Sequence, residues 1–148
     1  MQFSDSDFDR LSWHDCHIWG ISFRSGEPSE GDWTSELLLD IDFICEWCCT
    51  NPNGRFRVAP ATLAFHDVGS LEIAVHWTDS SLAYPLSIAE ISRAAEGSTS
   101  RWRVALNWPE GGEITFLAVG FNQTLRAEPV LIEEQRFTLR ERENLLGR

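Results

Sequence analysis

Apolar and polar residues alternate with a period of two along much of this chain, and that period is typical of β-strands. The alternation covers residues 17–23, 36–47, 71–77, 101–108 and 114–121. Stretches rich in glycine and proline, at 26–32 and 109–112, separate some of these segments and favour loops or turns. Because the segments are short and turn signals recur, the pattern predicts antiparallel strands, with 101–108 and 114–121 forming a hairpin.

Residues 53–68 combine a turn signal with a strand signal. Asn53 and Gly54 both tolerate a positive φ, so together they predict a tight hairpin turn after the strand at 36–47. The strand residues that follow are interrupted at Pro60, which has no N–H to donate and favours an edge strand or a bulge.

Residues 86–96 fit two structures. Their apolar positions begin by alternating as in a strand, but Ser87 and Glu90 have the spacing of a helical capping box, and Gly97 suits the end of a helix. The pattern leaves helix and strand open here.

Near the C-terminus, Thr138 and Glu141 form a second capping-box pattern, which predicts a short helix with Leu139, Arg142 and Leu146 on one side. The chain of 148 residues is short enough to be one domain, residues 1–148. Seven tryptophans and nine phenylalanines predict an aromatic core. We therefore expect a mainly β fold, an antiparallel sandwich or barrel-like sheet with a short C-terminal helix.

Charge changes this picture, because it is unevenly distributed. Eleven acidic and two basic residues fall in the first 54 positions of a chain with net charge −11, pI about 4.7 and no lysine. This balance disfavours nucleic acid and favours a basic protein or a cation as partner, although net charge also serves solubility alone. We find no signal-peptide pattern and no membrane-spanning apolar run, and therefore expect a cytosolic protein with reduced cysteines.

Asp40 and Asp42 are unusual because they interrupt an apolar strand segment. Side chains two positions apart share one face of a strand, at about 7 Å from each other. An exposed pair, or a pair bound to arginine, would be structurally unremarkable, whereas a pair lining a cleft would suit a metal, acid–base chemistry or an arginine-bearing partner.

The segment that precedes the first long strand carries His14, Asp15 and His17. With Asp40 and Asp42, the two histidines would form a site for a divalent cation such as zinc. A turn in which the histidines bond to backbone carbonyls is the other interpretation.

Cys45 and Cys48 have the spacing Cys-x-x-Cys. Together with His14 and His17 they would form a structural zinc site, although that histidine spacing is shorter than usual. The other interpretation is a set of buried, unreactive thiols.

Three strings resemble those of a family of small bacterial proteins without an assigned activity. They are LSWHDCH at residues 11–17, LDIDFICEW at 39–47 and VAPATLAFH at 58–66, and the similarity extends through 102–108 and 122–125. The resemblance implies a bacterial cytosolic protein that forms a stand-alone domain. In size and acidity the chain also resembles bacterial immunity proteins, which neutralise toxins.

The sequence therefore supports two functional hypotheses. In the preferred one, the chain is a non-enzymatic binding module that presents an acidic face to a basic protein. That face would include Asp40, Asp42, Glu46, His14, Asp15 and His17, together with the loop acids Glu27, Glu30 and Asp32. In the alternative, His14, His17, Asp40 and Asp42 bind a divalent cation in an enzyme, with Glu46 or Asp15 as the base. The oligomeric state stays open.

Overall fold

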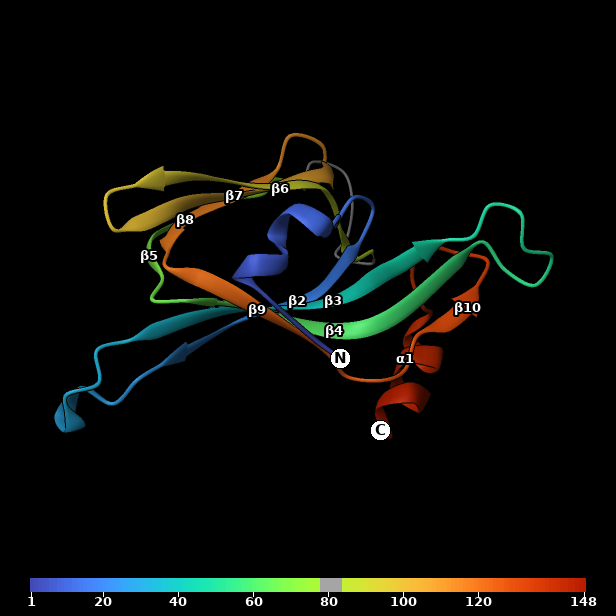
Figure 1. Ribbon diagram of the computed structural model, residues 1–148, viewed down its shortest axis with the longest axis horizontal. Helices are drawn as coiled ribbons and strands as arrows, with labels where there is room; N and C mark the ends of the chain where they lie inside the picture. Colours follow the sequence, from blue (N-terminus) through green and yellow to red (C-terminus); the bar gives the residue numbers. More distant parts are fainter. Residues whose placement is uncertain (78–83) are drawn as a thin grey trace.

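The computed structural model describes residues 1–77 and 84–148 of the chain, and the described residues form one extended antiparallel sheet (Figure 1). Its strands are β1 (Gln2–Ser4), β2 (His17–Ser25), β3 (Ser35–Trp47), β4 (Phe56–His66), β5 (Gly69–Ala74), β6 (Leu86–Glu96), β7 (Thr99–Trp108), β8 (Glu113–Ala118), β9 (Gly120–Leu125) and β10 (Val130–Ile132). Two 3-10 turns, η1 (Asp5–Arg10) and η2 (Pro28–Glu30), and the helix α1 (Leu139–Leu146) complete the described fold. The prediction of a mainly β, antiparallel architecture with a short C-terminal helix is confirmed.

The order of the strands, β1-β9-β4-β3-β2-β6-β7-β8-β5, divides the sheet into two parts. β2 pairs with β6 only through His17 and Ile18, so this joint is narrow. In Figure 1, the part made of β6, β7 and β8 lies over the part made of β2, β3, β4 and β9, with η1 between them. The sheet therefore folds back on itself like a sandwich.

Aromatic rings fill the space between the two parts. Phe65 of β4 lies 5.1 Å from Trp102 of β7 and 4.7 Å from Phe116 of β8, measured between ring centroids. Phe121 of β9 packs edge-on against Trp102 at 5.8 Å. All four rings are at most 3% exposed. Each large ring buries about 150–250 Å² of surface, so this cluster is a major source of the hydrophobic stabilisation.

Pro60 does not interrupt its strand, because β4 runs unbroken through it. The carbonyl of Pro60 accepts a hydrogen bond from the N–H of Arg126, so this side of Pro60 faces away from β3. On that side, β4 passes from β10, which pairs with Phe56–Val58, to β9, which pairs with Ala61–His66. Pro60, which has no N–H, lies between the stretch of β4 that pairs with β10 and the stretch that pairs with β9, so the sheet loses no hydrogen bond there.

Two expectations about local structure change, and one open alternative is decided. The prediction of a tight turn at Asn53 and Gly54 is wrong, because neither residue has a positive φ. A longer loop joins β3 to β4, and a hydrogen bond from the Cys48 N–H to the Arg55 carbonyl closes it. Residues 86–96 are strand β6, whose hairpin to β7 turns at Gly97 with φ of +63°. The segment 114–121 belongs to two strands, β8 and β9.

The helix α1 begins as its capping box predicts. The Thr138 side chain accepts a hydrogen bond from the Glu141 N–H, and the Glu141 carboxylate accepts one from the Thr138 N–H. Gly147 ends the helix in the left-handed conformation, with φ of +71°. This short helix brings Arg142, which is only 5% exposed, against the sheet. No helix in the described residues is long and apolar enough to cross a membrane.

Candidate functional site

Asp42 lies in the interior, where its carboxylate is fully enclosed by protein donors. One oxygen, Oδ2, accepts hydrogen bonds from the Trp19 indole N–H at 2.9 Å and from the Phe137 backbone N–H at 2.9 Å. The other oxygen, Oδ1, accepts from Nε of Arg142 at 2.8 Å. The exposed fraction of Asp42 is 0%. A charge buried this deeply is tolerated only when it is paired and hydrogen-bonded, and both conditions are met.

Asp40 binds the same arginine from the same face of β3. The two terminal nitrogens of Arg142 donate to the two oxygens of Asp40, with the Nη1–Oδ2 pair at 3.0 Å. Nη1 of Arg126 also donates to Oδ1 of Asp40, at 3.1 Å. The predicted shared face of the two carboxylates is therefore correct.

The Arg142 guanidinium is held by several groups at once. Nη2 also donates to the Ile41 carbonyl at 3.3 Å, and the group lies 5.5 Å from the Trp19 ring centroid. Burial opposes the charge of Arg142, but its hydrogen bonds to the Asp40 and Asp42 carboxylates, together with their negative charges, outweigh that penalty and raise the pKa of Arg142. Asp40, Asp42 and Arg142 therefore connect β3 to α1 inside the protein, and we call these three residues the internal clamp. Because Asp42 is fully buried in this clamp, it cannot contact a partner protein. The expectation that Asp40 and Asp42 form the centre of an acidic binding surface is therefore wrong.

His14 and Asp15 form a turn, in which Asp15 has φ of +63°, and His17 begins strand β2 two residues later. Nδ1 of His14 contacts the Ala89 carbonyl at 3.0 Å, which matches the expected backbone hydrogen bond. The Asp15 carboxylate accepts hydrogen bonds from Asn107 and from Gln135, at 2.9 and 3.0 Å. This turn therefore connects β7 to the segment that precedes α1.

His17 is a neighbour of Asp42 across the strands, because the two are register partners of β2 and β3. Burial, followed by the nearby charge of Arg136, lowers the pKa of His17. Its Nδ1 is buried and has no hydrogen-bond partner among the described residues. His14, by contrast, is turned toward β6. The geometry brings His17 and Asp42 together and directs His14 elsewhere.

A metal site does not form from the expected ligands. In residues 1–77 and 84–148 there is no group of three or more His, Cys, Asp or Glu side chains placed to hold a metal ion. The four cysteines are free thiols. Burial raises the pKa of the Cys16 thiol to about 12 and that of Cys45 to about 11. Both are therefore protonated and poorly reactive at neutral pH.

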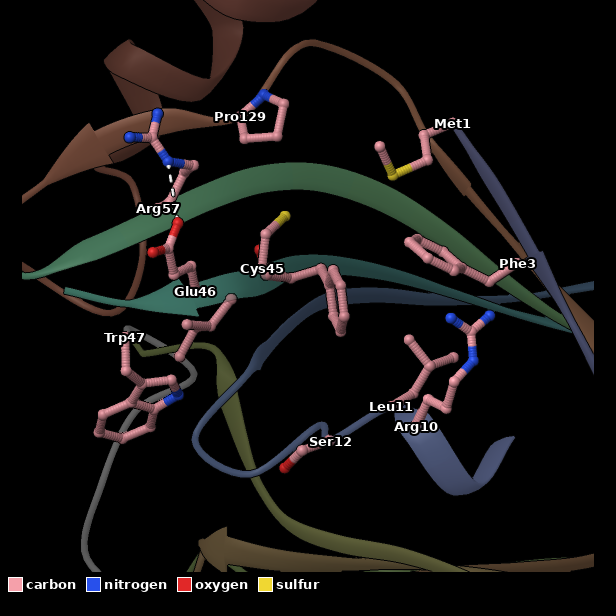
Figure 2. Close-up of a pocket in the computed structure, with 12 residues that line it drawn as sticks. Met1, Phe3, Arg10, Leu11, Ser12, Cys45, Glu46, Trp47, Arg57 and Pro129 are labelled. Atoms are coloured by element: carbon pink, nitrogen blue, oxygen red, sulfur yellow. Dashed lines mark hydrogen bonds and ion pairs between the residues drawn. The ribbon is translucent and has the colours of Figure 1, made fainter. Parts of the chain in front are cut away.

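Glu46 lines an open groove of about 560 Å³ between β1, the segment after η1 and the end of β3 (Figure 2). Its carboxylate lies 3.4 Å from Nε of Arg57, at one end of the groove. Arg10 lies at the other end and pairs with Asp7. Apolar side chains, among them Phe3 and Leu11, line the space between. The charged side chains that line this groove, Arg10, Glu46 and Arg57, already have partners.

The hairpin formed by β2 and β3 extends away from the rest of the molecule, at the lower left of Figure 1. Its tip, residues 26–34, carries the three loop acids and no basic residue. All three acids are exposed. We call residues 26–34 the acidic tip.

Internal hydrogen bonds order the acidic tip. The Glu27 carboxylate accepts from the N–H and hydroxyl of Ser29, and the Asp32 carboxylate accepts from the N–H and hydroxyl of Thr34. These bonds lower the pKa values of Glu27 and Asp32. The Gly26 N–H donates to the Thr34 carbonyl at 2.8 Å and closes the loop. The tip therefore presents fixed negative charges.

Two exposed aromatic residues of this hairpin were not among the predicted site residues. Trp33 is 80% exposed and Phe23 is 61% exposed. The available signal was a tryptophan beside Asp32 in a loop rich in glycine, proline and acids, where a core role is implausible.

Comparison of the chain with protein-family models, with curated proteins and with solved structures gave no match.

Proposed function

We propose that this chain is a non-enzymatic binding module that presents the acidic tip of its β2–β3 hairpin to a basic protein. The observation that carries the proposal is the combination, on one protruding and ordered loop, of three exposed carboxylates and a tryptophan ring that is 80% exposed. The binding surface differs from the expected one, because Asp40 and Asp42 belong to the internal clamp.

Physical chemistry gives each part of the tip a role in binding. Carboxylates steer a basic partner and set the specificity of the encounter. Tryptophan is enriched among residues that dominate binding energy, and its ring also attracts arginine and lysine. A loop that is ordered before binding loses less conformational entropy on association.

The partner class follows from the charge. The tip has three acids and the chain has net charge −11, so a basic protein surface is complementary to it. The resemblance of the three strings to a family of small bacterial proteins supports a bacterial, cytosolic setting for this proposal, and the likeness to bacterial immunity proteins is one of size and acidity. No feature of the described residues favours the metal-dependent enzyme, since the oxygens of Asp40 and Asp42 are bound by arginine, indole and backbone donors.

A capture experiment with two charge-matched variants tests the proposal. The tip variant is Glu27→Gln, Glu30→Gln and Asp32→Asn, and the control variant is Glu110→Gln, Glu128→Gln and Glu134→Gln, three exposed acids outside the tip. Each variant removes three charges. We expect the immobilised wild-type and control chains to retain the same basic protein from a bacterial lysate, and the tip variant to lose it.

Salt and the aromatic ring provide further criteria. Raising the ionic strength from about 0.1 M to about 1 M shortens the screening length from about 10 Å to about 3 Å and should release the partner. Trp33→Ser alone should weaken capture. Equal retention by the tip and control variants, or retention of a partner that is not basic, would contradict the proposal.

A further inference from the structure

A second concave site lies at the narrow joint between the two parts of the sheet. It is an open pocket of about 390 Å³, called the cavity below, and it is lined by His17, Tyr84, Pro85, Ser87, Trp108 and Arg136. It is separate from the acidic tip and does not depend on the proposed function.

The floor of this cavity is a row of register partners. Ser87 of β6 pairs with His17 of β2 on one side and with Trp108 of β7 on the other. Partners directly opposite each other in antiparallel strands place their side chains on the same face. An imidazole, a hydroxyl and an indole therefore lie side by side along one face, although they are up to 91 positions apart in the chain.

The segment before α1 places a cation over this row. The Phe137 N–H binds Asp42, the register partner of His17 on β3, and Nη1 of the neighbouring Arg136 donates to the Phe137 carbonyl at 3.3 Å. The Arg136 guanidinium lies 5.8 Å from the Trp19 ring centroid and 5.9 Å from the Tyr84 ring centroid. No carboxylate among the described residues lies within 4.0 Å of it, unlike Arg142.

His17, one of the lining residues, also has a buried ring nitrogen, Nδ1, without a hydrogen-bond partner among the described residues. A buried polar atom in this condition is unfavourable, and a ligand that supplies its partner gains affinity. Two further features select a ligand. The planar guanidinium of Arg136 can bind a carboxylate in a bidentate manner, and the exposed rings of Tyr84 and Trp108 line the sides of the cavity.

We infer that this cavity binds a small aromatic carboxylate. The carboxylate pairs with Arg136, the ligand ring packs between Tyr84 and Trp108, and a polar substituent or bound water on the ring side reaches His17. A ligand that has a carboxylate but no aromatic ring, or a ring but no carboxylate, makes only one of these two contacts and should bind more weakly.

Fluorine NMR with 4-fluorobenzoate as the probe tests the inference on the full chain. We expect the probe signal to broaden and shift on addition of protein, and cyclohexanecarboxylate and 4-fluorobenzyl alcohol to compete weakly. Arg136→Gln should weaken binding at least about tenfold, which corresponds to the loss of about 1.4 kcal/mol. Arg140→Gln, an exposed arginine of α1, is the matched control and should leave binding unchanged.

A second measurement uses the wild-type chain and does not depend on how the variants fold. The nitrogen chemical shifts of the His17 ring should change on saturation with 4-fluorobenzoate, while those of His14 stay constant. Failure of the probe to bind at millimolar concentration, equal weakening by Arg136→Gln and Arg140→Gln, or equal binding of the non-aromatic acid would overturn the inference.

Discussion

The strand pair β2–β3 carries two groups of carboxylates with the same charge and opposite surroundings. At one end, Asp42 is fully buried and shares Arg142 with Asp40. At the other end, the carboxylates of the acidic tip are exposed and bind only neighbours within their own loop. Buried charges are costly unless compensated, and exposed ones are not, so the first group serves the fold and the second is free to meet a partner.

This difference shows why local charge density is an incomplete guide to a binding surface. The apolar residues around Asp40 and Asp42 indicate that this strand segment is buried, and a buried carboxylate needs a cation to compensate its charge. That cation comes from a helix about one hundred positions later in the chain. The acidic tip has no apolar neighbours to bury it, and its hydrogen bonds are formed within a few residues.

The largest effect is expected from Arg142→Met, which leaves Asp42 buried without its cation. Breaking a buried pair by removing one partner costs about 3–5 kcal/mol of the free energy of unfolding. Urea denaturation followed by tryptophan fluorescence measures it. Arg140→Met, on the exposed side of α1, is the control and should leave the midpoint close to that of the wild type. Similar midpoints for both variants would show that the clamp contributes little.

The next effect tests how α1 is positioned for that clamp. Thr138→Ala removes the side chain that accepts from the Glu141 N–H and should lower the free energy of unfolding by about 1 kcal/mol. Thr138→Ser keeps the hydroxyl and should restore most of the loss. If serine is no better than alanine, the cap does not act through this hydrogen bond.

A third experiment uses pH to examine the neighbour of the clamp. His17 has a lowered pKa in the folded state, because of its burial and the charge of Arg136, with Asp42 and Asp15 acting in the opposite direction. The unfolded chain therefore binds a proton first, near its ordinary pKa of about 6.5. The contribution of neutral His17 is complete above that pH and is lost as the pH falls through the folded pKa.

Consequently, the stability of the wild type should fall between pH 7 and pH 5 more steeply than that of His17→Gln, measured by urea midpoints across the range. Identical slopes would show that His17 titrates in the folded chain as it does in the unfolded one.

The smallest effect on stability is expected for substitutions in the acidic tip. The tip variant Glu27→Gln, Glu30→Gln and Asp32→Asn should keep the urea midpoint of the wild type, because these exposed carboxylates stabilise only their own loop. A marked loss of stability together with the loss of partner capture would assign the tip a structural role.

Much of the fold was predictable because its signals are local. The period of two located β2, β3 and β7, and the capping box located α1. Residues 86–96 were ambiguous since Ser87 and Glu90 mimic a cap, and pairing with β2 and β7 decides for a strand. Long-range pairing of this kind overrides local propensity.

The candidate site was predictable only in part. The sequence indicated that Asp40 and Asp42 share a face, and that Arg142 lies on one side of the C-terminal helix. The sequence did not indicate that Arg142 contacts Asp40 and Asp42, because contacts between β3 and α1 form only in the folded protein. The cavity above His17 escaped prediction for the same reason: its floor joins three strands and its cation comes from a fourth segment.

The most direct test of the account is a double-mutant cycle between Asp42→Asn and Arg142→Met, measured by urea denaturation. Because Asp42 and Arg142 stabilise each other, the double variant should lose less stability than the two single losses added together, with a coupling energy of about 0.5–3 kcal/mol. Strictly additive losses would contradict this expectation, because they would mean that the buried carboxylate and the arginine do not stabilise each other.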